Sequence, residues 1–421
     1  MDGRVGGGGH VVIGPAGHLL YSADLIGAVG ARLSGLWRDN SRLALAVQAA
    51  RAGTMVKHRL PRNGGAGVWF RRSWTNPAQC HPMPMIPETH RVAVLHDPAE
   101  VTPRWLEGAL GRRVQSFARS DALSNWGAHV LIVARVEGAP APLKLRVKLG
   151  SATVFGRGEV DYYQRAFVGL ADAPLVRCHH ADADETHYHL LLDDMTDSHR
   201  NQDDVLVTEG YGRELVESLA QLHAHRWAQT APAALAIEAS FGRAMAGLPV
   251  MLDAMQEDFS AAERSTVREV FDALPRALVR RAQVPAGFSW VHGDLNPGNI
   301  LAPRAGPGRV LLIDYQPFLH TPPMNGLALS DLAQAMVLWW PERACGHWSR
   351  ALVAHWHARL ESQGVGYATP GRLREDWQLC VAQTLMVPAS RCSEPGTVTT
   401  MRWLWQTHVR RALAALADAR G

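Results

Sequence analysis

Hydrophobic and polar positions alternate with the spacing of strands in the part of the chain that begins near residue 88. Three short segments, 130–136, 143–149 and 188–192, are either mostly apolar or alternate between apolar and polar residues. Such short segments predict strands. Ahead of them, Thr102 and Pro103 suit the N-cap and the first position of a helix that runs to about residue 110. A sheet with one short preceding helix is therefore predicted here.

Helical spacing occurs once in the strand-rich part of the chain and dominates after about residue 210. Apolar residues recur every three or four positions in segments predicted to be helices: 159–170, 211–227, 329–340, 347–363, 372–387 and 399–419. Short strands around loops are predicted at 288–291, 299–302 and 310–313. A strand-rich part followed by a helix-rich part predicts a two-lobed α+β fold, with an N-lobe over 88–195 and a helical C-lobe over 196–421.

Residues 1–87 differ in composition from everything that follows. They hold ten Lys or Arg, only three acidic residues and two glycine-rich runs. Such a segment cannot bury a core, so we expect a poorly ordered N-terminal extension or translated sequence upstream of a true start at Met83 or Met85. An Arg-rich leader is a third interpretation.

Composition and charge exclude several classes of protein. Residues 88–421 hold 33 basic and 36 acidic side chains, so no nucleic-acid partner is expected. No run of about eighteen apolar residues predicts a membrane span, and no signal peptide is evident, so the expected location is the cytoplasm. The five cysteines are scattered, which argues against a disulfide framework and against a zinc site built from paired cysteines.

The chemistry is concentrated between residues 292 and 314. His292-Gly-Asp294 follows an apolar run, Asn299 comes five positions after Asp294, and Asp314 ends the next apolar run. An Asp that accepts a hydroxyl proton, followed at this spacing by a metal-binding Asn, is the arrangement of a kinase catalytic loop. A second Asp after a short strand would complete a set of oxygen ligands that suits Mg²⁺.

These motifs resemble the aminoglycoside phosphotransferase and choline kinase superfamily, over about residues 88–400. Ile313-Asp-Tyr-Gln316 is most similar to the ecdysteroid kinase-like branch, whose metal motif tends to end in Gln. The resemblance implies a protein kinase-like fold and an ATP- and Mg²⁺-dependent reaction. It implies that Asp294 is the catalytic base, that Asn299 and Asp314 bind magnesium, and that His292 and Asp331 support the catalytic loop.

The resemblance also implies ATP-binding residues in the N-lobe. A strand Lys should hold the phosphates and pair with a helix Glu, and Lys148 and Glu159 match these positions, although Lys144 lies on the same strand face. Residues 190–195 would form the hinge, with the backbone of Asp194 and Met195 against adenine. The turn over 121–127 would cover the phosphates, but it carries a single glycine, unlike the glycine-rich loop of protein kinases.

The acceptor is expected to be a small molecule that bears a hydroxyl group. Sixteen residues separate Asp314 from Asp331, and no Ala-Pro-Glu follows, which leaves little room for a peptide-docking segment. An acidic pocket would suit an aminoglycoside and an apolar pocket a steroid-like or lipid-like alcohol. The alternatives are a nucleotide-binding pseudokinase that acts as an interaction module, and a kinase that acts on polypeptides. The sequence does not specify the oligomeric state.

Histidines are clustered at Cys178-His-His180 and His187-Tyr-His189. They could be metal ligands, but the simpler interpretation is a histidine-rich turn before the hinge strand, with side chains alternating across it.

Overall fold

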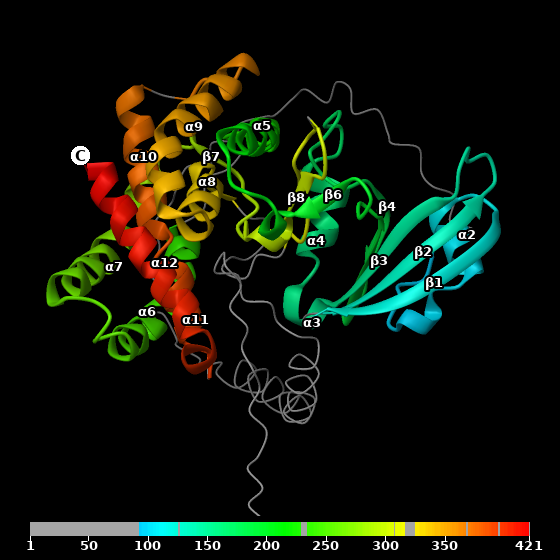
Figure 1. Cartoon of the computed structure of the whole chain (residues 1–421), viewed down its shortest axis with the longest axis horizontal. Coiled ribbons are helices and arrows are strands. Elements are labelled where there is room, and N and C mark those ends of the chain that lie inside the picture. The colour runs from blue at the N-terminus through cyan, green and yellow to red at the C-terminus, as the bar shows by residue number, and fades with distance from the viewer. Residues whose placement is uncertain are drawn as a thin grey trace, which may run out of the picture. The chain divides into compact units, whose positions relative to one another are not determined.

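Strands and helices occupy successive parts of the chain (Figure 1). The computed structural model describes residues 92–124, 127–228, 234–306, 308–315, 325–367, 369–394 and 396–420. All of them belong to one compact unit, Pro84–Gly421. The extension predicted over 1–87 lies outside the described residues. Below, "N-lobe" means residues 92–195 and "C-lobe" residues 196–420.

The N-lobe is built on a five-stranded antiparallel sheet in the order β1-β2-β3-β5-β4. Its strands are β1 (Val114–Ser124), β2 (Gly127–Val136), β3 (Leu143–Ser151), β4 (Cys178–Ala183) and β5 (His187–Asp193). The three strands predicted from sequence are β2, β3 and β5. The pattern does not predict β1 and β4, because these are the two edge strands and their positions need not alternate between core and solvent.

One face of this sheet is covered by helix α2 (Pro103–Leu110). Trp105 and Leu106 pack against the buried apolar positions of β2 and β3. The helix begins as predicted, because Thr102 Oγ1 accepts the Trp105 N–H at 3.2 Å. The alternate positions of β3, which carry its three cationic side chains, point to the opposite face.

A short helical connection follows β3, and it corrects the helix predicted over 159–170. Helices α3 (Ala152–Phe155) and α4 (Gly158–Asp161) lead into a π-helical turn, Tyr162–Ala166. The helix ends four residues earlier than predicted. The Arg226 guanidinium donates a hydrogen bond to the Ala166 carbonyl, so this carbonyl needs no partner from a further helical turn.

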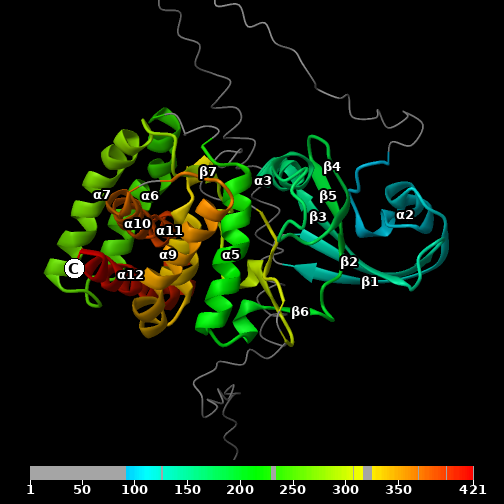
Figure 2. The same cartoon turned by 90° about the horizontal axis from the view of Figure 1, so that it is seen from above.

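The C-lobe is mainly helical, and with the sheet of the N-lobe it confirms the predicted protein kinase-like α+β fold (Figure 2). Its helices are α5 (Glu209–His225), α6 (Ala234–Ala254), α7 (Ala261–Arg281), α8 (Leu329–Ala333), α9 (Glu342–Ser362), α10 (Pro370–Gln383), α11 (Met386–Cys392) and α12 (Thr397–Arg420). Its short strands are β6 (His199–Asn201), β7 (Phe288–Trp290), β8 (Ile300–Pro303), β9 (Leu311–Leu312) and β10 (Asn325–Leu327).

Two predicted C-lobe helices are divided in the structure. The segment 329–340 consists of α8 and a π-helical stretch, Gln334–Trp339. The segment 372–387 ends at Gln383, and α11 begins at Met386. Pro388 explains this break, because it has no N–H to continue α10 but fits the first turn of a new helix. The sequence pattern does not predict α6 and α7.

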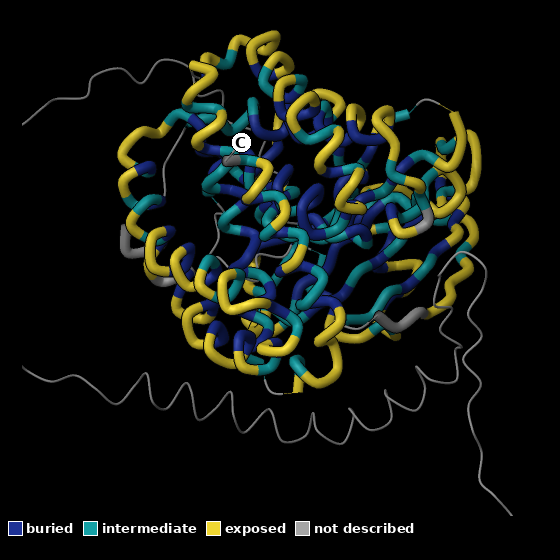
Figure 3. The backbone as a smooth tube through the Cα atoms, turned by 60° about the vertical axis from the view of Figure 1, so that its left-hand side comes forward, coloured by how far each residue is buried: buried dark blue, intermediate teal, exposed yellow. Residues whose placement is uncertain are grey.

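A single apolar core holds the C-lobe together (Figure 3). Trp340 and Trp356 are fully buried within it. Helix α6 approaches α11 so closely that a Cβ on Gly247 would lie 1.8 Å from the Ala389 carbonyl oxygen, which requires glycine at this position. Among the described residues, no helix combines the length and the apolar character needed to cross a membrane.

Candidate active site

The loop after β7 brings two of the predicted residues together. Asn299 Nδ2 donates to the Asp294 backbone carbonyl at 2.8 Å and lies 3.4 Å from Asp294 Oδ2. Asn296 caps the intervening 3₁₀ turn, Pro297–Asn299, by accepting the Gly298 N–H at 2.9 Å. This capped turn reverses the chain between Asp294 and Asn299, so that the Asp294 carboxylate and the Asn299 amide come into contact.

The Asp294 carboxyl lies in a largely buried setting. Burial raises its pKa above the usual value for Asp, while His292 and Asn296 act to lower it. Asn296 Nδ2 donates to Asp294 Oδ1 at 3.3 Å. Asn296 is a further residue of this site that the motifs did not predict. Its place two positions after Asp294 is the signal that could have found it, since Asn side chains commonly bond to neighbouring groups in turns.

Asp331 holds the backbone of the loop that carries His292 and Asp294. Its carboxylate is 1% exposed and accepts the backbone N–H groups of His292 at 2.7 Å and Gly293 at 2.9 Å. His223 of α5 contacts the same carboxylate at 3.0 Å. Gln334, three residues after Asp331 on the same helical face, accepts the Leu295 N–H at 3.0 Å. Neither His223 nor Gln334 was predicted from the sequence, because both reach the loop only through the fold.

His292 links the catalytic loop to the strand that precedes Asp314. Its Nε2 donates to the Ile313 carbonyl at 2.9 Å, and its Nδ1 accepts the Asp294 N–H at 3.3 Å. The two bonds use both ring nitrogens of His292. A bracing role for His292 is compatible with these contacts and stays a prediction.

Asp314 follows β9 in a left-handed conformation, with φ of 61°. Non-glycine residues seldom adopt this region, and such strain is concentrated at functional sites. The Ile313 N–H donates to the Asn299 carbonyl at 3.1 Å, so the backbone connects the two predicted metal ligands. Lys148 of β3 donates to Asp314 Oδ1, across the boundary between the lobes.

Lys148 also binds Glu159, at 2.7 Å from Nζ to Oε2. Glu159 is 4% exposed at the start of α4. Burial acts to lower the pKa of Lys148, but the carboxylates of Glu159 and Asp314 outweigh it and raise the pKa above its usual value. Lys144 lies elsewhere and pairs with Asp197 at 2.5 Å, in an exposed position. The structure thus places Lys148, and not Lys144, beside the other predicted residues.

Asp194 and Met195 lie in the link between the lobes. The Asp194 N–H donates to the Lys144 carbonyl at 2.9 Å, and the Asp194 carboxylate accepts the Thr196 hydroxyl at 2.6 Å. The Met195 carbonyl accepts the His199 N–H at 2.8 Å. These bonds form the turn that follows β5, and an adenine-binding role for this segment stays a prediction. Residues 125–126 of the predicted phosphate-covering turn and Gln316 lie outside the described residues.

The donor groups at this site fit a magnesium ion. The Asn299 amide nitrogen is directed at Asp294, which leaves its carbonyl oxygen for a cation. Lys148 occupies one oxygen of Asp314, and the second oxygen has no bond to any described residue. Carboxylate and amide oxygens are the ligands that Mg²⁺ accepts in proteins.

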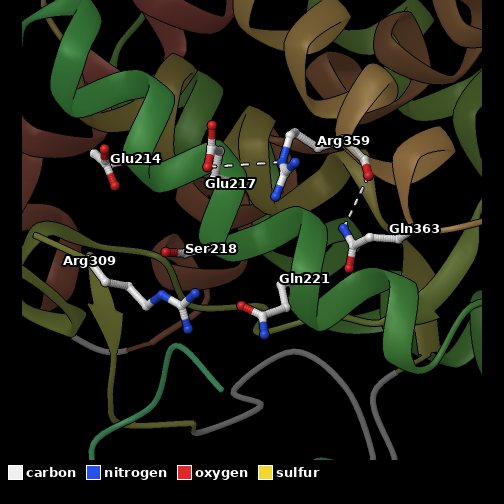
Figure 4. Close-up of a pocket in the computed structure, with 7 residues that line it drawn as sticks. All are labelled: Glu214, Glu217, Ser218, Gln221, Arg309, Arg359 and Gln363. Atoms are coloured by element: carbon white, nitrogen blue, oxygen red, sulfur yellow. Dashed lines mark hydrogen bonds and ion pairs between the residues drawn. The ribbon is translucent and has the colours of Figure 1, made fainter. Parts of the chain in front are cut away.

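A separate polar depression, of about 270 Å³, lies on the C-lobe (Figure 4). It is lined by side chains of α5, by Arg359 of α9, by Gln363, which follows that helix, and by Arg309. Glu217 and Arg359 face each other across it, with 3.9 Å between Glu217 Oε2 and Arg359 Nε. None of the predicted site residues lines this depression, so we do not assign it to the acceptor.

Comparison with known proteins gives one match at the level of sequence families. The sequence model of a family described as the phosphotransferase enzyme family matches residues 137–375, which is more than half of the chain. The matched segment contains every site residue predicted above. No curated protein matches the chain significantly.

Several solved structures are similar to this one at low identity. A spectinomycin phosphotransferase, solved with ADP and spectinomycin, is 11% identical, with a TM-score of 0.44 over 75% of this chain and 96% of that one. A choline kinase from Cryptosporidium parvum is 13% identical, with a TM-score of 0.43 over 72% and 89%. A macrolide 2'-phosphotransferase from Brachybacterium faecium is 16% identical, with a TM-score of 0.39 over 74% and 96%. These likenesses carry no conclusion about the acceptor of this chain.

Proposed function

Because this chain belongs to the phosphotransferase enzyme family, we propose that it transfers the γ-phosphoryl group of ATP to a hydroxyl group of a small molecule. The observation that carries the proposal is the convergence of groups from both lobes. Asn299 contacts Asp294 at the end of one loop, and Lys148 joins Glu159 to Asp314. Phosphoryl transfer needs oriented reactants and neutralised charge more than covalent help from the protein, and this set of residues supplies both.

Asp294 acts on the acceptor in this proposal. Its carboxylate accepts a hydrogen bond from the acceptor hydroxyl and orients the oxygen toward the γ-phosphorus. It takes the proton as the new P–O bond forms and the bond from the γ-phosphorus to the β–γ bridging oxygen breaks, which releases ADP. Asp331 and His292 are positioning residues, because they bind the backbone of the loop and not the reactants.

ATP is held between the lobes. Lys148 contacts the phosphates, and Glu159 keeps the ammonium group in place, since the Lys148–Glu159 pair is largely buried. Asp194 and Met195 supply backbone groups to the adenine ring. Asn299 and Asp314 would hold Mg²⁺, which would neutralise the charge of the phosphates.

The proposed acceptor is a small molecule because the chain has little space for peptide docking. Only sixteen residues lie between Asp314 and Asp331, and the Ala-Pro-Glu of protein kinases is absent from the sequence. Within the family, we place the chain in the ecdysteroid kinase-like branch, on the motif Ile313-Asp-Tyr-Gln316.

The experiment that tests the proposal is Asp294→Asn, assayed with labelled ATP, Mg²⁺ and a library of hydroxyl compounds. We expect turnover of any accepted compound to fall by about 10²- to 10⁴-fold, because the amide cannot take the proton. ATP affinity, measured by calorimetry, should change little. Below neutral pH, the wild-type rate should decline at a higher pH than a solvent-exposed Asp would give, since burial raises the pKa of Asp294.

Asp253→Asn provides the matched control. Asp253 is an exposed residue of α6 outside the site, so this variant should retain wild-type turnover. If Asp294→Asn were as active as Asp253→Asn, Asp294 would not be the base. If the wild type transferred phosphate to no member of the library, the proposed activity would lose its support.

A further inference from the structure

Three potential metal ligands meet at the edge of the N-lobe sheet, away from the site described above. They are His96, which precedes α2, and Asp184 and His187, which flank the turn between β4 and β5. One ligand atom from each lies within 4.8 Å of the others. His96 Nε2 is 2.5 Å from Asp184 Oδ2, and the rings of His96 and His187 stack with centroids 4.5 Å apart.

The Asp184 carboxylate is fixed by the turn in which it lies. Its Oδ1 accepts the backbone N–H groups of Thr186 at 2.7 Å and His187 at 2.8 Å. These bonds hold the pKa of the carboxyl well below its usual range, so the group is ionised at neutral pH. The second oxygen, Oδ2, contacts His96 and is the carboxylate oxygen directed at the cluster.

Thr186 also orients His187. The Thr186 hydroxyl donates its only proton to Asp184 Oδ1, at 2.9 Å. Thr186 Oγ1 and His187 Nδ1 lie 2.9 Å apart, and in this hydrogen bond the imidazole N–H must therefore be the donor. That places the proton on Nδ1 and leaves the lone pair of Nε2 available. Metal-binding histidines are oriented in the same way, by a hydrogen bond from the other ring nitrogen.

The segment that carries His96 is held against the same hairpin. The His96 N–H donates to Glu100 Oε2 at 2.7 Å, and the Leu95 N–H donates to His189 Nδ1 at 3.2 Å. His189 is fully buried in β5 and stacks on His180. The backbone on both sides of the cluster is thus held by hydrogen bonds, while the His96 side chain is half exposed.

We propose that His96, Asp184 and His187 bind a divalent transition-metal ion of the Zn²⁺ type. Two imidazoles and one carboxylate are ligands that Zn²⁺ accepts in a tetrahedral site, with a fourth position for water. The ion replaces the His96–Asp184 hydrogen bond and is held by Nε2 of each histidine and by Asp184 Oδ2. It differs from the magnesium ion of the proposed active site, which has only oxygen ligands, and it does not depend on the proposed kinase activity.

The consequence of binding would be a cross-link between two segments of the N-lobe. His96 lies just before α2, whereas Asp184 and His187 lie at the far end of the hairpin that leads into the hinge. An ion bound by the folded state alone stabilises that state by RT ln(1 + c/Kd), where c is the free ion concentration, so the stabilisation grows as c rises above Kd. The N-lobe should therefore resist unfolding better when the site is filled.

The test uses the full chain, stripped of metal with a chelator and kept in excess Mg²⁺ to occupy the oxygen-ligand site. Zn²⁺ is titrated in competition with a coloured chelator, and the melting temperature is recorded with and without Zn²⁺. We expect one tight site and a higher melting temperature with Zn²⁺. His187→Ala should abolish this site, and Thr186→Val should weaken it by about 10- to 100-fold, as loss of an outer-shell hydrogen bond does.

Two comparisons decide the outcome. His347→Ala removes an exposed histidine of α9 outside the cluster, and it should bind Zn²⁺ like the wild type. Equal affinity in the wild type and in His187→Ala would overturn the proposal, because the ion would then bind elsewhere among the twenty histidines of the chain. If His187→Ala fails to fold, Thr186→Val decides alone. An unchanged affinity in that variant would mean that the histidines bind metal without a built site, and would overturn the proposal equally.

Discussion

At the scale of single residues, the three cations on one face of β3 are used in three different ways. Lys144 pairs with Asp197 in solvent, and Arg146 contacts Asp194. Only Lys148 is largely buried, and it bridges two carboxylates from different parts of the chain. The same side-chain chemistry at alternate positions therefore predicts the face of the sheet on which a cation lies, but not its role.

This difference predicts the outcome of a matched pair of substitutions. Lys148→Ala should lower kcat/KM for phosphoryl transfer by about 10²-fold or more, because an electrostatic contact with the phosphates is lost. Lys144→Ala should leave it nearly unchanged, because Lys144 pairs with Asp197 in solvent and contacts none of the predicted site residues. Steady-state kinetics with ATP as the varied substrate measures both, and thermal denaturation shows that each variant is folded. A larger loss in Lys144→Ala would reassign the phosphate contact to Lys144.

At the scale of elements, the contact between α6 and α11 is set by a glycine. A Cβ on Gly247 would lie 1.8 Å from the Ala389 carbonyl oxygen and 2.8 Å from the Ser393 nitrogen, both of which are backbone atoms. Neither atom can move without shifting α11. Gly242, five residues earlier in α6, has no atom within 4 Å of its Cβ position.

Alanine at these two positions should therefore have opposite effects on stability. Gly247→Ala should reduce the free energy of unfolding by about 1–3 kcal/mol or more, because the two helices must separate. Gly242→Ala should increase it by about 0.5–1 kcal/mol, because Ala is the better helix former in open space. Urea denaturation followed by circular dichroism measures both. Equal effects would show that α6 and α11 are not in close contact in solution.

At the scale of the whole molecule, buried histidines in both lobes make folding sensitive to acid. Burial, with a smaller effect of His180, lowers the pKa of His189 in the N-lobe to about 4. Burial, with a smaller effect of Arg411, lowers the pKa of His408 in the C-lobe to about 3. Both side chains are 0% exposed, and among the described residues neither ring nitrogen of His408 has a hydrogen-bond partner.

The sign of the pH dependence follows from these directions. A histidine with a pKa of about 6.5 in the unfolded chain takes up a proton there before it does so in the folded protein. Stability is thus fully present above pH 6.5 and falls as the pH decreases toward 4. When the pH is lowered from 7.5 to 5, the free energy of unfolding should decrease by about 2 kcal/mol for each of these histidines.

Urea denaturation at these two pH values checks the prediction, with His408→Leu as the diagnostic variant. Leucine removes the buried polar ring, so the loss of stability at pH 5 should be smaller by about 2 kcal/mol than in the wild type. A variant with an undiminished loss would show that His408 is not a neutral buried group.

The sequence alone determined what depends on neighbours along the chain. The strand at 143–149, the capped helix that begins at Pro103 and the short turn from Asp294 to Asn299 all follow from local periodicity, capping and spacing. The three residues predicted to bind the acceptor hydroxyl and the metal were identified this way, because they belong to one segment of about twenty residues. Local hydrogen bonds and turn geometry restrict such a segment strongly.

Only the tertiary structure decided which distant groups meet. Lys148 and Asp314 are 166 positions apart, and alternation along β3 could not choose between Lys148 and Lys144. His96 and His187 are likewise brought together by the fold alone. The edge strands β1 and β4 were not predicted either. A strand at the edge of a sheet is stabilised by its partner strand more than by its own apolar pattern. Contacts of this kind depend on how elements pack, which no local pattern encodes.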